Sequence, residues 1–470
     1  MAYTVDERGS WVKPSDKDNR ASWLSGSTQY SYDDPEQQDS GVPVVSAPAA
    51  PGSSQSPSEK PNTPAAAGDF PEGGFRAWSV AVGTAAALFC TMGYLNSYGV
   101  YQTYYESHQL SFMTPSAISW IGSLQNFFVF FSSLFGGALF DRYGGPVIVA
   151  PAAAAYVLSI MMTSLCTEYW QFVLAQGVLG GISNGMVMSP ALAATSQYFS
   201  KRRGAAMGLS IAGASLGAVV FPIALVKMLP DASSPNIGFP WAVRVCGFIA
   251  LGMLIWPCMA IRARLPPRKN SLILLSAFRR PVYLATVAAT FLLFLGFFTP
   301  LYYLPSYAVA HAGLSPSLSN YLLAILNGAS FFGRIVPGIL ADKLGRFNTL
   351  AFAGVSSGIL TLCWTRCTTA PTVIAFAALY GFSSGAVVSG FTVALAFCAD
   401  QPKNIGTYMG MGMAVASIAM LIGPPVNGVL LARYGGFDGM AILSGVVCIA
   451  GGLVSLAAKV LQGKGVLSLS

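Results

Sequence analysis

Twelve apolar runs, each close to the length that crosses a bilayer, follow one another after Trp78. A helix needs roughly 20 apolar residues to span membrane hydrocarbon. The runs occupy residues 79–104, 116–140, 147–165, 170–195, 204–226, 241–261, 281–310, 318–341, 348–365, 371–399, 404–431 and 440–458. Unpaired backbone groups in lipid cost several kcal/mol each, and a membrane barrel would alternate in polarity. We therefore predict an all-α membrane protein with twelve transmembrane helices.

The composition agrees with lipid as the solvent. Hydrophobic residues make up 54% of the chain and charged residues 9%, whereas an average soluble domain has roughly 25% charged residues. The formal net charge is +8, and basic residues cluster at the ends of the apolar runs rather than on one soluble face. This pattern favours a lipid bilayer as partner and argues against nucleic acid. The eight cysteines show no metal-like or disulfide-like spacing, so we expect no metal and no cofactor.

Five segments follow from the distribution of these runs. Residues 1–75 are rich in Ser, Pro, Asp, Gln and Ala, which predicts a disordered cytoplasmic tail. Residues 76–261 form a first six-helix half, 262–280 a cytoplasmic central loop, 281–460 a second six-helix half, and 461–470 a second cytoplasmic tail. The amino terminus has no basic region followed by an apolar core, so we expect the first spanning helix to act as the targeting signal.

Orientation follows from the basic residues between the runs. Residues 201–203 are all basic, and 262–280 contains six more Lys and Arg residues. The connections on the opposite side hold only Lys227, Arg366 and Arg433. By the positive-inside rule both termini are cytoplasmic. We expect the protein in the plasma membrane, with a vacuolar or other internal membrane as the alternative.

A short polar segment after the second run returns after the eighth run, about 200 positions later. The first copy consists of Gly137, Asp141, Arg142 and Gly144, and the second of Gly338, Asp342, Lys343 and Gly345. Six helices bring the chain back to its starting side, so the two copies have the same orientation. This predicts a parallel repeat with a substrate path between its halves.

The pattern Gly-x-Leu-x-Asp-Arg/Lys-x-Gly resembles the hallmark loop of the major facilitator superfamily, and the resemblance covers all twelve helices. Two further segments resemble the signatures of its monocarboxylate transporter family. They contain Gly73, Gly74 and Trp78 before the first run, and Tyr198, Phe199, Lys201, Arg202, Arg203 and Gly204 before the fifth. The tail and composition resemble the fungal members, which handle organic acids, vitamins or secondary metabolites.

Arg334 lies inside an apolar run, where a charge costs several kcal/mol unless it is paired or hydrated. Asn327 and Ser330 fall on the same helix face. A guanidinium can hold a carboxylate in a bidentate fork, so an anionic group is its natural partner. The family resemblance implies a substrate-linked arginine here and an aspartate one turn earlier, where this chain has Ser330. A structural Arg334, bonded to backbone or to a neighbouring helix, remains the alternative.

Other polar side chains within the runs are candidates to line the substrate path. They are Asn96, Tyr98, Gln125, Asn126, Asn184 and Tyr302. For each of them, hydrogen bonding between helices is an equally good interpretation. Animal relatives carry a coupling lysine in the first helix and this chain has none, so the sequence assigns proton coupling to no residue.

Enzyme motifs do not fit this chain. Three Gly-x-Ser-x-Gly segments lie within apolar runs, and neither histidine is placed to serve them as a base. The sequence contains no Walker loop and no His-Glu-x-x-His. We expect a monomeric secondary-active transporter, not an enzyme, which exports an organic acid or secondary metabolite by alternating access. The alternatives are proton-coupled uptake of a monocarboxylate or vitamin, and a non-transporting nutrient sensor.

Overall fold

The computed structural model describes residues 4–5, 11–12, 70–229, 237–266, 273–434 and 436–463. Residues 1–63 are one unit, in which strand β1 (Thr4–Val5) pairs antiparallel with β2 (Trp11–Val12). The rest of the predicted N-terminal tail up to residue 69 lies outside the described residues, as do the middle of the central loop and residues 464–470.

The first half of the second unit consists of helices that run back and forth in sequence order. They are α1 (Gly74–Leu88), α2 (Tyr98–Ser107), α3 (Pro115–Tyr143), α4 (Gly145–Thr163), α5 (Tyr169–Phe172), α6 (Gly180–Tyr198), α7 (Arg203–Met228) and α8 (Phe239–Ala260). The π-helical turn Phe89–Gly93 continues α1 towards α2, and the π-helical turn Val173–Leu179 joins α5 to α6. These eight helices therefore make six membrane spans.

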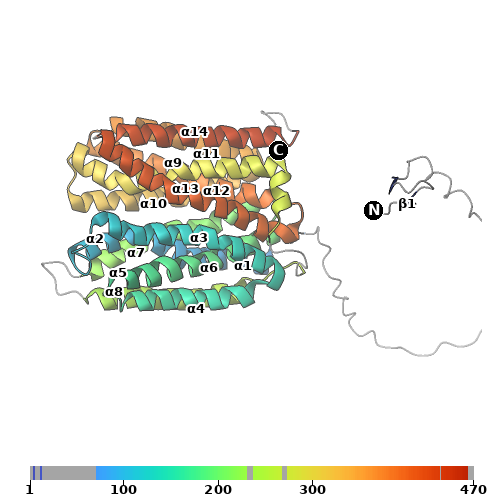
Figure 1. Cartoon of the computed structure of the whole chain (residues 1–470), viewed down its shortest axis with the longest axis horizontal. Helices are drawn as coiled ribbons and strands as arrows, with labels where there is room; N and C mark the ends of the chain where they lie inside the picture. Colours follow the sequence, from blue (N-terminus) through green and yellow to red (C-terminus); the bar gives the residue numbers. More distant parts are fainter. Residues whose placement is uncertain are drawn as a thin grey trace, which may run out of the picture. The chain divides into compact units, whose positions relative to one another are not determined.

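The second half repeats this arrangement with six long helices. They are α9 (Pro281–Ala312), α10 (Pro316–Leu344), α11 (Arg346–Cys363), α12 (Ala370–Phe397), α13 (Ile405–Tyr434) and α14 (Asp438–Val460). Short 3₁₀ turns lie at Leu275–Arg279, Trp364–Arg366 and Pro402–Asn404. Within the described residues, twelve spans are long and apolar enough to cross a membrane, so the predicted twelve-helix fold is confirmed (Figure 1).

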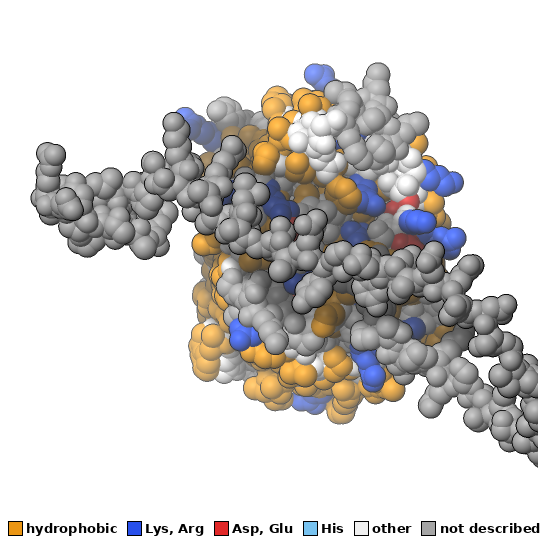
Figure 2. Space-filling view, turned by 90° about the vertical axis from the view of Figure 1, so that its right-hand side faces the viewer, with side chains coloured by type: hydrophobic (Ala, Val, Ile, Leu, Met, Phe, Trp, Pro, Cys, Tyr) orange, Lys and Arg blue, Asp and Glu red, His pale blue; other side chains and the backbone are white. Residues whose placement is uncertain are grey.

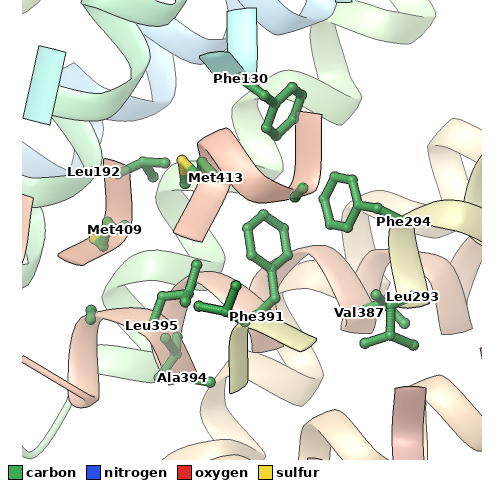
Figure 3. Packing of buried hydrophobic residues seen from close by; sticks show 14 of the residues in the cluster. Phe130, Leu192, Leu293, Phe294, Val387, Phe391, Ala394, Leu395, Met409 and Met413 are labelled. Carbon is green, nitrogen blue, oxygen red and sulfur yellow. The ribbon is translucent and has the colours of Figure 1, made fainter. Parts of the chain in front are cut away.

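The two halves meet along a pair of long helix contacts, in which α3 packs against α13 and α7 against α10. A cluster of buried apolar side chains spans this interface (Figure 3). Phe130 and Leu192 come from the first half, and Phe294, Phe391 and Met413 from the second. The rings of Phe130 and Phe294 lie 5.5 Å apart between centroids, so aromatic packing links the halves directly.

Charged side chains gather at one end of the bundle. Figure 2 shows this end, where Lys and Arg side chains surround a few acidic ones and orange apolar side chains cover the flanks. An apolar flank with charged ends is the distribution expected for a protein that spans a bilayer. We call this surface the basic end.

Candidate functional site

Asp342, near the end of α10, binds the first turn of α7 in the other half. Its carboxylate accepts hydrogen bonds from the backbone N–H groups of Gly204 at 2.7 Å and Ala205 at 2.9 Å. N–H groups in the first turn of a helix have no partner within that helix. The positive end of the helix dipole also favours a carboxylate there. We call this contact the α7 gate.

Asp141, near the end of α3, makes the equivalent contact with α13. Its carboxylate accepts hydrogen bonds from the backbone N–H of Gly406 at 3.2 Å and of Thr407 at 2.7 Å, and from the Thr407 hydroxyl at 2.8 Å. Asp141 is only 5% exposed. We call this contact the α13 gate. The aspartate of each half thus binds a helix of the other half.

The glycines of the repeated segment allow this close approach. A Cβ at Gly137 would overlap the carbonyl oxygen of Gly406, and one at Gly338 would lie 2.6 Å from the carbonyl oxygen of Gly204. Both repeat segments end on a glycine with positive φ, 85° at Gly144 and 94° at Gly345. A left-handed conformation suits glycine because it has no Cβ. The halves are therefore in tight backbone contact at these two gates.

The basic residues that follow the gate aspartates lie at the surface. Arg142 and Lys343 are exposed, and the guanidinium of Arg142 lies 5.4 Å from the ring centroid of Tyr143. Their positions suit interaction with the membrane surface or with solvent.

Arg334 lies at the interface between the halves, two turns before Asp342 on α10. Its Nη1 donates a hydrogen bond of 2.8 Å to the carbonyl oxygen of Ile211 on α7, and its side chain is only 9% exposed. Its buried Nε has no hydrogen-bond partner in the part of the chain that the structure describes. Among the described residues no carboxylate forms an ion pair with it. One bond to a neighbouring helix is therefore present, but the charge is left without a counter-ion.

The two companions of Arg334 on α10 meet other neighbours. Asn327 is buried and donates a 2.9 Å hydrogen bond to the carbonyl oxygen of Leu323 in its own helix. Ser330 packs against Gly385 of α12, inside the second half. Asn327 thus bonds within α10, Ser330 packs on α12 and Arg334 reaches α7.

Asn126 and Tyr302 do meet across the two halves. The Asn126 amide nitrogen lies 3.4 Å from the Tyr302 hydroxyl and donates a 3.0 Å bond to the carbonyl oxygen of Gly122. Tyr302 is 44% exposed. The rings of Phe298 and Tyr302 are 5.9 Å apart between centroids. A polar contact thus continues the aromatic interface away from the basic end.

Two further candidates for the substrate path lie at the break between α1 and α2. Asn96 is exposed in the break between α1 and α2, and its amide donates a 2.7 Å hydrogen bond to the carbonyl oxygen of Met92. The Tyr98 hydroxyl donates a 2.5 Å hydrogen bond to the carbonyl oxygen of Ile118 on α3. Tyr98 therefore joins helices, whereas the described hydrogen bond of Asn96 is local.

Two buried amide side chains have polar atoms without a hydrogen-bond partner among the described residues. Asn184 is 0% exposed, and neither polar atom of its side chain has a hydrogen bond; Gln125, 3% exposed, has an unpartnered Oε1. Asn184, Met188 and Leu192 are spaced by four residues, so they share a face of α6. Met188 and Leu192 belong to the cluster between the halves, so Asn184 faces the same interface.

The two family signatures lie against each other at the basic end. Gly73 precedes α1 and Gly74 begins it, and the ring of Trp78 lies 5.2 Å from that of Phe199 between centroids. Tyr198 ends α6, and the turn holding Lys201 and Arg202 leads into Arg203 and Gly204. The two segments are more than 100 residues apart in the chain, so the sequence alone does not show that they touch.

Known proteins share this fold and much of the sequence. A profile of the Major Facilitator Superfamily matches residues 80–400. The chain is 53% identical over 400 residues to the aspyridones efflux protein apdF of Emericella nidulans, covering 84% of this chain and 81% of that one. It is 38% identical over 386 residues to the agnestins efflux protein AgnL12 of Paecilomyces divaricatus, covering 82% and 87%.

A solved structure supports the same fold. The human organic anion transporter MFSD10 superposes with a TM-score of 0.63 at 18% identity, covering 81% of this chain and 99% of that one. The twelve spans, the two gates across the halves and the sequence match agree on one assignment. The chain belongs to the Major Facilitator Superfamily.

Proposed function

We propose that this protein is a secondary-active efflux transporter for a secondary metabolite that carries an acidic or strongly polar oxygen group. Relatives named as efflux proteins for aspyridones and agnestins support the direction and the substrate class. Buried Arg334, which has an unpartnered Nε and no carboxylate partner among the described residues, carries the acidic part of the proposal.

The gates define how the cycle runs. Both gates are made in this structure, so the halves are held together at the basic end. Substrate can reach Arg334 from that end only after Asp342 leaves α7 and Asp141 leaves α13. An acidic group on the substrate then supplies the counter-ion that the guanidinium lacks, and the gates close behind it. This order of events is alternating access between two halves.

The basic end is cytoplasmic in this proposal, and both termini lie on that side. The concentration of Lys and Arg there is what the positive-inside rule predicts for the cytoplasmic face. We place the transporter in the plasma membrane, where export leaves the cell, and expect it to work as a monomer without covalent chemistry. We also place the chain in the monocarboxylate transporter family, a proposal that rests on the resemblance of the two signature segments.

Gene deletion followed by metabolite analysis tests this function. The deleted strain is compared with wild type and with a strain complemented by the intact gene. We expect at least one acidic metabolite to rise inside the cells and fall in the medium, with both changes reversed by complementation. An unchanged profile together with lost uptake of a simple monocarboxylate or vitamin would overturn export in favour of uptake.

A further inference from the structure

Glu72, just before α1, holds the turn that leads into α7. Its Oε1 accepts hydrogen bonds from the backbone N–H groups of Ser200 at 2.8 Å and Lys201 at 2.7 Å, and its Oε2 from that of Arg202 at 3.1 Å. Its own N–H donates to the carbonyl oxygen of Tyr198 at 3.3 Å. One carboxylate thus accepts from three successive backbone N–H groups, and charged acceptors make the stronger hydrogen bonds.

Glu72 has an unusual backbone conformation. Its φ is 53°, and among the described residues no other non-glycine residue has a positive φ. A side chain other than glycine rarely adopts this conformation, so surrounding contacts must maintain it. Strained conformations of this kind cluster at functional sites, where they fix the position of a side chain.

Aromatic and basic side chains secure the same segment. Phe70 lies beneath two guanidinium groups, 5.7 Å from that of Arg203 and 5.3 Å from that of Arg264. Arg203 also donates through Nε to the carbonyl oxygen of Phe199 at 2.9 Å. The start of the first span is therefore fixed to the turn between α6 and α7. We call this contact the Glu72 latch.

The Glu72 latch and the α7 gate use N–H groups that are close together in the chain. Arg202 supplies the last of the three N–H groups, and Gly204 and Ala205 supply the N–H groups that bind Asp342. A rotation of this turn would also rotate the N–H groups of Gly204 and Ala205. Their hydrogen bonds to Asp342 would then weaken, because a hydrogen bond weakens steeply as it departs from linear geometry. The orientation of the α7 gate thus depends on Glu72.

The second half has a contact at the corresponding place, made by an ion pair instead of backbone N–H groups. Arg280, just before α9, lies 3.7 Å from the carboxylate of Asp400 in the turn between α12 and α13. Asp400 also accepts hydrogen bonds from the backbone N–H of Gln401 at 2.8 Å and the amide of Asn404 at 2.7 Å. That turn leads directly into Gly406 and Thr407 of the α13 gate. We call this contact the Arg280 latch.

We propose that Glu72 and Arg280 are positioning residues of the two gates, each tying the first span of its half to the N-terminus that the opposite aspartate binds. The first span and the gate helix of each half then move together. The same mechanical link appears twice, with different chemistry, in two halves related by the internal repeat. The proposal rests on the gate contacts and is independent of the substrate and of the direction of transport.

Backbone hydrogen exchange of the full chain in lipid nanodiscs tests the Glu72 latch. The amides of Gly204 and Ala205 lack helical partners, so their protection reports Asp342 binding. Glu72→Gln should speed exchange about tenfold or more at residues 200–202 and also at these two amides, because a neutral acceptor replaces a charged one. Lys201→Ala is the matched control, since it keeps the same backbone N–H and should leave both sets unchanged.

Arg280→Gln tests the second latch in the same way, with its exposed neighbour Arg279→Gln as control. It should speed exchange at Gly406 and Thr407, whereas Arg279→Gln should not. The interior amides of α4 report whether each variant remains folded. Faster exchange at 200–202 with unchanged Gly204 and Ala205 would reduce Glu72 to a local structural role, and unchanged exchange in both latch variants would overturn the proposal.

Discussion

Arg334 is buried and carries a full charge, and its one described hydrogen bond goes to the carbonyl oxygen of Ile211. Removing a charged group from water costs several kcal/mol, and a carbonyl offsets only part of this. The sequence revealed Arg334 because a charge interrupts an apolar run. It could not reveal that Ser330 turns towards α12, because side-chain direction depends on which helix packs on which face.

The contacts of Glu72, unlike the position of Arg334, could not be seen in the sequence. Its partners are the N–H groups of residues 200–202, far along the chain. Backbone groups are present in every residue, so a contact made with them leaves no distinctive residue on one side of the pair. A resemblance marked both segments without showing that they touch. The role of Glu72 thus required the structure.

Replacement of Arg334 tests its proposed role in substrate binding. Lysine keeps the charge but loses the planar fork, so Arg334→Lys should raise the apparent KM for the exported acid about tenfold or more. Arg334→Ala should abolish transport while the protein still inserts, because a less polar helix enters the membrane more readily. Transport into inside-out vesicles measures both.

Arg366→Lys serves as the control for that experiment, since Arg366 is exposed and lies away from the interface between the halves. It should leave KM unchanged. If Arg334→Lys and Arg334→Ala both reached the membrane and transported normally, the guanidinium would have a purely structural role or none.

At the scale of elements, hydrophobic length predicted all twelve spans, and the helix ends agree closely where proline and glycine mark them. Pro281 begins α9, and Gly144 and Gly345 follow α3 and α10. The break in the first span was not predicted: residues 79–104 read as one run, but the helix passes through a π turn and is interrupted before α2. Apolar residues permit either geometry, so composition could not distinguish them.

Gly137 provides the test of close packing between elements. In Gly137→Ala the new methyl group would meet the carbonyl oxygen of Gly406, so α3 and α13 must separate. Because the α13 gate needs that approach, we expect transport to fall about tenfold or more with little loss of membrane insertion. Gly252→Ala in α8, where a Cβ would meet nothing within 4 Å, is the matched control. Equal transport by the two variants would show that close backbone approach at Gly137 is dispensable.

The membrane-spanning part of the molecule consists of two similar halves, and one aspartate of each half binds the other half. Asp141 binds α13 and Asp342 binds α7, so both contacts must break when the halves part at the basic end. The repeated sequence predicted two equivalent loops. It did not predict that each carboxylate crosses to the opposite half, because the partners are again mainly backbone N–H groups.

Coupling between the two gates is the final prediction. Asp342→Asn removes a charged acceptor from Gly204 and Ala205, which weakens two hydrogen bonds directly. If the halves move as rigid bodies, the closed state is less populated everywhere, so exchange should also rise about tenfold at the amides of Gly406 and Thr407 in the untouched gate. Asp141→Asn should produce the reciprocal change at Gly204 and Ala205. Asp438→Asn, an exposed carboxylate at the start of α14, should affect neither gate. Exchange that rises only beside the substituted aspartate would show that the gates open independently, and the rigid-body cycle would have to be replaced by local movements of α7 and α13.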